Sequence, residues 1–269
     1  MEVDKIKEII EESGHDLHFR IADSLSAQGW NVQVSPYYND PVKNIPREID
    51  IVAIKTHTIG NGIDPLVYRL FIECKYIKGD NVIWFRKKDR EKATLLAKDN
   101  EILRDQEDHY LEDQSFRPPK AHHYLKDDQV MKLSSKKGDK DPFYDGMNGS
   151  LHALLFYQES QYTSYAIDLP MIVVDSFNNL HRRDGSNPEG HTAITDNFQM
   201  EVDYIYINRQ EKPVARYFLI DVVNESTLID FLEMVESSEA NVLKRLISFQ
   251  AQQRKNNQMF DGGPLVDMY

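Results

Sequence analysis

The chain has 269 residues, with 32 Lys and Arg against 44 Asp and Glu, and a formal net charge of −12. Hydrophobic residues make up 41% of it and aromatic residues 10%, so there is enough apolar material for a packed core and wholesale disorder is excluded. A single cysteine excludes a disulfide framework and a cysteine-rich zinc module. The acidic balance argues against non-specific coating of nucleic acid but allows a local basic groove.

The sequence shows no membrane or export signal. No apolar run approaches the ~20 residues that a membrane-spanning helix needs, and the charged N-terminus lacks the apolar centre of a signal peptide. We therefore expect a cytoplasmic protein with no membrane partner. No linker separates two halves of the chain, so we expect one elaborated domain over 1–269.

The first predicted elements are a helix and a strand. Apolar residues recur every three or four positions over 15–28, which predicts an amphipathic helix capped by Gly29. The stretch 30–35 alternates apolar and polar residues, as a half-buried strand does. The turn-rich stretch 36–46 predicts a loop.

A hairpin is predicted next. Two apolar runs, 48–54 and 66–77, are joined by a turn that contains Gly and Asn, which is typical of antiparallel pairing. A shorter strand is expected at 81–85.

The remainder of the chain predicts helices, strands and long loops. The acidic stretch 99–113 is expected to form an exposed helix or a mobile insertion. The order of elements predicts an α/β fold with a mixed central sheet. The other expected elements are helices at 120–134, 145–160 and 226–250, strands at 170–175, 202–207 and 214–223, and a long loop at 181–198.

Three charged residues lie inside the two otherwise apolar strands of the hairpin. Glu73 and Lys75 are two positions apart, so their side chains leave the same face of a strand, about 6.6 Å apart along it. Cys74 points to the opposite face, and Asp50 lies on the neighbouring strand. Because buried unpaired charge is costly, we expect these groups to compensate one another or to bind a cation.

The residue types suit phosphodiester hydrolysis. Asp50 and Glu73 offer the hard oxygen ligands that Mg²⁺ or Mn²⁺ prefers. A nearby Lys75 would orient or deprotonate a water, or stabilise charge on a phosphoryl oxygen. The alternative interpretation is an internal salt bridge of the sheet that has no chemical role.

A family resemblance rests on these residues. The segments REIDIVAI and FIECKY give Asp50, a spacer of 22 residues, and then Glu73-Cys74-Lys75, after a helix and a strand. This order resembles the PD-(D/E)XK nuclease superfamily over about 14–85. It implies a restriction-endonuclease-like core, a mixed central β-sheet flanked by helices, with a later core strand near 170–176. Insertions and a C-terminal hairpin plus helix would elaborate that core.

The resemblance also implies an activity. It implies metal-dependent cleavage of nucleic acid, as by a DNA endonuclease of prokaryotic defence or repair that uses Mg²⁺ or Mn²⁺. Asp50, Glu73 and the backbone carbonyl of Cys74 would be the metal ligands, and Lys75 would activate water.

The resemblance leaves one metal ligand and the assembly open. Many members carry a Glu on the first helix that completes the metal site. Here Glu12 or His18 would take that place, or the site lacks this ligand. A homodimer is a reasonable expectation, because cleavage of two strands needs two sites.

A basic segment follows the motif. Residues 66–92 contain eight basic and four acidic residues, although the whole chain is acidic. We interpret it as an edge that follows nucleic-acid phosphates, the alternative being the solvated start of a helix. The candidate contact residues are Lys78, Arg86, Lys87, Lys88 and Arg90.

Two further functions stay open. The protein could be a catalytically inactive member of the same fold that serves as a binding or assembly module. The pair His15-Asp16 resembles the HD pair of metal phosphohydrolases, but that family needs further His and Asp positions.

Overall fold

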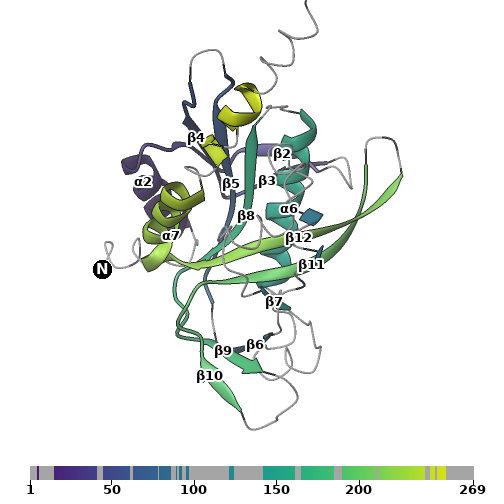
Figure 1. Cartoon of the computed structure of the whole chain (residues 1–269). Helices are drawn as coiled ribbons and strands as arrows, with labels where there is room; N and C mark the ends of the chain where they lie inside the picture. Colours follow the sequence, from purple (N-terminus) through teal and green to yellow (C-terminus); the bar gives the residue numbers. More distant parts are fainter. Residues whose placement is uncertain are drawn as a thin grey trace, which may run out of the picture.

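The computed structural model describes residues 15–40, 45–60, 63–77, 79–85, 121–123, 142–160, 165–184, 190–208, 212–239, 243–245 and 247–252, and a few single positions besides. Its elements form a layered α/β structure (Figure 1). In chain order they are α2 (His15–Ala27), β1 (Asn31–Val34), β2 (Tyr37–Asn39), β3 (Pro46–Glu48), β4 (Ile51–His57), β5 (Leu66–Lys75), β6 (Asn81–Phe85), β7 (Ala121–His123), α6 (Pro142–Ser160), β8 (Ala166–Val174), β9 (Leu180–Asp184), β10 (His191–Ala193), β11 (Phe198–Ile207), β12 (Pro213–Asn224), a 3₁₀ turn (Glu225–Thr227), α7 (Leu228–Met234) and a π-helical turn (Val235–Glu239).

A seven-stranded mixed sheet forms the centre, in the order β1-β4-β5-β8-β12-β11-β7. Strands β1, β4 and β5 are antiparallel, whereas β8 runs parallel to both β5 and β12. Two smaller sheets, β10-β9-β6 and β2-β3, lie beside it. The predicted α/β class with a mixed central sheet, and the predicted hairpin, are therefore confirmed.

Helices cover both faces of this sheet, with α2 and α7 on one face and α6 on the other (Figure 1). The alternation of strand β5 divides its side chains between the two layers. Ile72 and Cys74 belong to the core cluster that contains Leu17 of α2, whereas Phe71 belongs to the cluster that contains Leu154 of α6. The side chains on either side of Cys74 therefore face α6.

Several loops of the sequence analysis are strands, so those predictions were wrong. The stretch 36–46 contributes β2 and the first residue of β3, and 181–198 contributes β9 and β10. The helix expected at 120–134 is contradicted at 121–123, which form a strand parallel to β11. These strands are short, and β7 and β9 pair with the distant strands β11 and β6, so local propensity does not reveal them.

The boundaries of two other elements also differ. Strand β8 begins at Ala166 rather than Pro170. Pro170 is tolerated because β8 pairs only with β5 at that point, and β12 joins at Met171. The helix expected at 226–250 is divided into the 3₁₀ turn, α7 and the π-helical turn, and the described residues at 243–245 and 247–250 are helical as predicted. The acidic stretch 99–113 lies outside the described residues.

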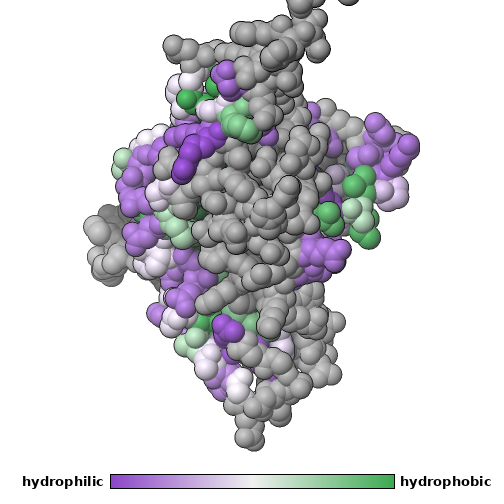
Figure 2. Space-filling model, viewed as in Figure 1, coloured by the Kyte–Doolittle hydropathy of each residue, from purple (hydrophilic) through white to green (hydrophobic). Residues whose placement is uncertain are grey.

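The hairpin ribbon formed by β11 and β12 carries exposed apolar side chains. Ile205 and Ile207 of β11 are solvent-exposed. Figure 2 shows hydrophobic surface beside hydrophilic surface where the outer part of this ribbon lies. No helix in the described part of the chain is long and apolar enough to cross a membrane.

Candidate functional site

The structure brings Asp50, Glu73 and Lys75 together. Asp50 directly precedes β4, and the register of the hairpin, Ile51 opposite Ile72, places it beside the end of β5. The Lys75 ammonium donates a hydrogen bond to Glu73 Oε2 at 2.6 Å and lies 4.0 Å from Asp50 Oδ2. Two acids and one ammonium thus meet at the ends of neighbouring strands.

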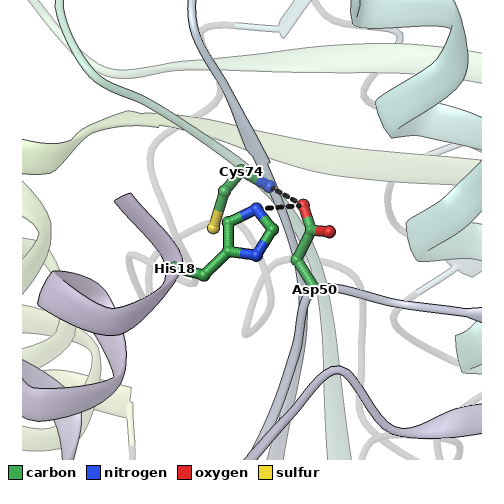
Figure 3. A group of neighbouring side chains, drawn as sticks. All are labelled: His18, Asp50 and Cys74. Atoms are coloured by element: carbon green, nitrogen blue, oxygen red, sulfur yellow. Dashed lines mark hydrogen bonds and ion pairs between the residues drawn. The ribbon is translucent and has the colours of Figure 1, made fainter. Parts of the chain in front are cut away.

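Asp50 also faces helix α2 (Figure 3). Its Oδ2 atom accepts a hydrogen bond from the backbone N–H of Cys74 at 2.7 Å and lies 3.3 Å from His18 Nε2. The second carboxylate oxygen of Asp50 points away from the imidazole. Burial lowers the pKa of His18, and this effect outweighs the attraction of the Asp50 carboxylate. His18 is therefore neutral near pH 7, the form in which an imidazole binds metals.

Helix α6 closes over Glu73 because two glycines face the site. A Cβ atom at Gly149 would overlap the Glu73 carboxylate, and one at Gly146 would lie 3.3 Å from Lys75 Cε. The Tyr38 hydroxyl donates a hydrogen bond to the carbonyl of Gly149 at 3.4 Å. Glu73 is consequently only 7% exposed.

The charges of this cluster do not balance. Burial raises the pKa of Glu73 to about 7, Lys75 opposes that rise, and the negative charge of Asp50 adds to it. Burial acts to lower the pKa of Lys75, but Glu73 and Asp50 outweigh burial, so the pKa of Lys75 is raised. One ammonium therefore serves two carboxylates, and the site carries excess negative charge when both carboxylates are ionised.

A second buried polar network, which the sequence analysis missed, ties α6 to distant strands. Asp40 is fully buried, pairs with Arg47, and lies 3.3 Å from His152 Nδ1 of α6. His152 Nε2 contacts the hydroxyl of Tyr204, which donates to Asn148 Oδ1 at 3.1 Å. These residues are single polar positions far apart in the sequence, and no sequence pattern predicts that they lie together.

The structure describes only part of the predicted set. Glu12 and the five basic candidates, Lys78, Arg86, Lys87, Lys88 and Arg90, lie outside the described residues. His18 lies beside Asp50, whereas Asp16 of the HD pair forms an ion pair with Arg20.

Comparisons with protein-family models, with characterised proteins and with solved structures give no match to this chain.

The raised pKa of Glu73 predicts a stability that depends on pH. The folded state holds the Glu73 proton more tightly than the unfolded state, whose carboxyl has a pKa near 4.5. This contribution is complete below pH 4.5 and is lost as the pH rises through 7. We expect the free energy of unfolding, measured by urea denaturation without divalent ions, to lose on the order of 3 kcal/mol across this range.

Glu73→Gln should remove this component, so its profile should be flatter than that of the wild type. Glu233→Gln, at an exposed position of α7, is the matched control and should follow the wild type. Parallel profiles for Glu73→Gln and the wild type would contradict the assignment.

The close approach of α6 predicts a difference between its two glycines. Alanine normally stabilises a helix interior by about 1 kcal/mol relative to glycine. At Gly149 the new methyl group must displace a buried carboxylate, so we expect Gly149→Ala to lower the free energy of unfolding by about 1–3 kcal/mol. In Gly146→Ala the neighbouring side chains of Ile172 and Lys75 need to move by only a few tenths of an ångström, so the free energy of unfolding should be nearly unchanged. Chemical denaturation that gave equal stability for both variants would show that Glu73 is not confined beneath Gly149.

Proposed function

We propose that the protein is a divalent-metal-dependent nuclease that hydrolyses phosphodiester bonds. The observation that carries this proposal is the position of the Lys75 ammonium, 2.6 Å from Glu73 Oε2 and 4.0 Å from Asp50 Oδ2. Two hard oxygen donors with a cation beside them form the set of groups that metal-assisted phosphodiester hydrolysis uses.

The order of the elements supports a restriction-endonuclease-like core. Helix α2 and strand β1 precede β4, which follows Asp50, and β5, which holds Glu73 and Lys75. Strand β8 then lies parallel to β5. The resemblance to the PD-(D/E)XK superfamily implies this sequence of helix, strand, Asp strand and Glu-x-Lys strand, followed by a later core strand near 170–176.

The residues present fit a bound Mg²⁺ or Mn²⁺. Asp50, Glu73 and the backbone carbonyl of Cys74 would hold the ion, with His18 as a further ligand from α2. The raised pKa of Glu73 supports this assignment, because burial destabilises its charged form and a bound cation would offset that cost. When bound, the ion supplies Lewis-acid polarisation of the phosphodiester and lowers the pKa of water.

Lys75 has a narrower role in this proposal than the sequence alone allowed. Glu73 and Asp50 outweigh the effect of burial and raise the pKa of Lys75, so the side chain is an ammonium at neutral pH. An ammonium donates hydrogen bonds and does not accept a proton. We therefore assign Lys75 to orienting the attacking water and stabilising charge on the phosphoryl oxygens.

The substrate proposed is DNA, and the protein would act as an endonuclease of prokaryotic defence or repair in the cytoplasm. This part rests on the family resemblance. A homodimer would place two sites on the two strands of a duplex.

A second candidate is a catalytically inactive binding or assembly module of the same fold. The burial of Glu73 beneath α6 favours it, because a carboxylate that is 7% exposed offers little access to a substrate. This candidate predicts no stabilisation by Mg²⁺ or Mn²⁺.

The nuclease proposal predicts cleavage of plasmid DNA by the purified protein with Mg²⁺ or Mn²⁺. Lys75→Ala should lower the cleavage rate about 100-fold or more, because it removes a group that stabilises charge in the transition state. Lys212→Ala, which changes an exposed lysine outside the site, is the matched control and should cleave as the wild type does. Equal cleavage by the wild type and Lys75→Ala would refute the assignment.

Metal binding separates the two candidates without an activity assay. A ligand that binds only the native state must raise the melting temperature. We expect Mn²⁺ to raise the melting temperature of the wild type, and Asp50→Asn to abolish that shift. An unchanged melting temperature of the wild type would favour the inactive module.

A further inference from the structure

The face of Asp50 that is turned toward helix α2 carries a different set of donors from the face near Lys75. One ligand atom each from His18, Asp50 and Cys74 lies within 4.8 Å of the other two. The three residues come from α2, from the start of β4 and from β5, so the fold rather than the local sequence assembles them (Figure 3). Both His18 and Cys74 are buried, and Asp50 is half-buried.

We propose that His18, Asp50 and Cys74 form a binding site for a thiophilic transition-metal ion, with Zn²⁺ as the natural ligand. This site is not the hard-cation site of the proposed nuclease, because it uses the thiolate sulfur of Cys74 in place of the Glu73 carboxylate. The two sites share the Asp50 carboxylate and the His18 imidazole, and they differ in Glu73 against the Cys74 sulfur.

The distances already approach those of a tetrahedral zinc site. Bonds of about 2.0 Å to nitrogen and oxygen place two such ligand atoms about 3.3 Å apart. The separation of His18 Nε2 and Asp50 Oδ2 is 3.3 Å. Cys74 Sγ, with a bond of about 2.3 Å, needs to lie about 3.5 Å from each of the other ligand atoms. Cys74 Sγ lies within 4.8 Å of both other ligand atoms, so a small movement of the thiol would close the site, and a water would complete four ligands.

The surroundings of the site also suit an ion. The Cys74 N–H donates to Asp50 Oδ2 and so orients this carboxylate toward His18. The His18 side chain is 10% exposed, yet its Nδ1 atom has no hydrogen-bond partner within the described residues. The other ring nitrogen, Nε2, is turned toward the Asp50 carboxylate and is the atom that would bind the ion.

The donor chemistry selects the metal. Thiolate and imidazole ligands favour Zn²⁺ over Mg²⁺, which prefers oxygen. On binding, the S–H bond of Cys74 breaks, a sulfur–metal bond forms, and the proton leaves to solvent, with no change of oxidation state. Because Asp50 serves both sites, Zn²⁺ should compete with the activating ion. That inhibition rests on the proposed function, whereas the binding itself does not.

The test uses Co²⁺ as a coloured substitute for Zn²⁺ on the full chain with its cysteine reduced. Cys74 is the only cysteine, so any thiolate-to-Co²⁺ charge-transfer absorption must arise there. We expect this absorption to saturate at one Co²⁺ per chain. One equivalent of Zn²⁺ should abolish it, and one equivalent of Mg²⁺ should not.

Variants locate the remaining ligands. Cys74→Ala should lose the absorption, and His18→Gln should weaken Co²⁺ binding at least tenfold. The control is His181→Ala. His181 lies on β9, pairs with Asp80 and is outside the proposed site, so this variant should bind Co²⁺ as the wild type does. Circular dichroism and melting curves establish that each variant is folded. Should a variant fail to fold, the wild-type absorption alone decides.

A folded wild type that binds no Co²⁺, or binds it without the charge-transfer absorption, overturns the proposal, as does equal binding by folded Cys74→Ala. Failure of the nuclease proposal is distinguishable. A wild type that shows the absorption but leaves plasmid intact with Mg²⁺ and Mn²⁺ has the zinc site and lacks the nuclease activity.

Discussion

The burial of Glu73 is the constraint on which the site depends. A carboxylate placed between a sheet and a helix loses its hydration, and only a nearby cation or a proton can restore the balance. Lys75 donates to it at 2.6 Å, but Asp50 adds a second negative charge to the same place. The protein alone therefore supplies less positive charge than its acids require, and a divalent ion would supply the rest. Burial is the main cause of the raised pKa of Glu73, and the same burial would favour a metal ion beside the carboxylate.

Asp50 links the two layers of the fold. It stands at the point where β4 begins, so its carboxylate is not confined to one face of the sheet. Its Oδ2 atom lies near the imidazole of α2 and near the ammonium of β5. Hard donors gather toward α6 and softer donors toward α2, which is why the same carboxylate can belong to two sites that prefer different ions.

Local patterns were sufficient to predict the parts of the site that lie on one hairpin. The alternation of β5 places Glu73 and Lys75 on one face and Cys74 on the other, and the register of the hairpin brings Asp50 beside them. The helix at 15–28 and the strand at 30–35 were also predicted, because amphipathic periods and Gly29 are local signals. The positive backbone angle of Gly29, φ 80°, confirms its role at the end of α2.

What the sequence could not reveal depends on contacts between distant segments. Strand β7 is three residues that pair with β11, far along the chain, and β9 pairs with β6. Gly149 looks like a weak point in a helix until the structure shows that Glu73 occupies the space of its missing side chain. Asp40 and His152 likewise acquire meaning only as partners across the fold.

The Asp40 network explains how α6 is held close to the site. Apolar residues of α6 pack in the core, and polar contacts add to that packing near the site. Asp40 contacts His152, and His152 contacts the hydroxyl of Tyr204. That hydroxyl donates to Asn148, the residue next to Gly149. The geometry around Glu73 is therefore determined in part by groups on β11 and on the segment between β2 and β3. Substitutions in this network would therefore change the position of α6 over Glu73, although the network lies outside the cluster of Asp50, Glu73 and Lys75.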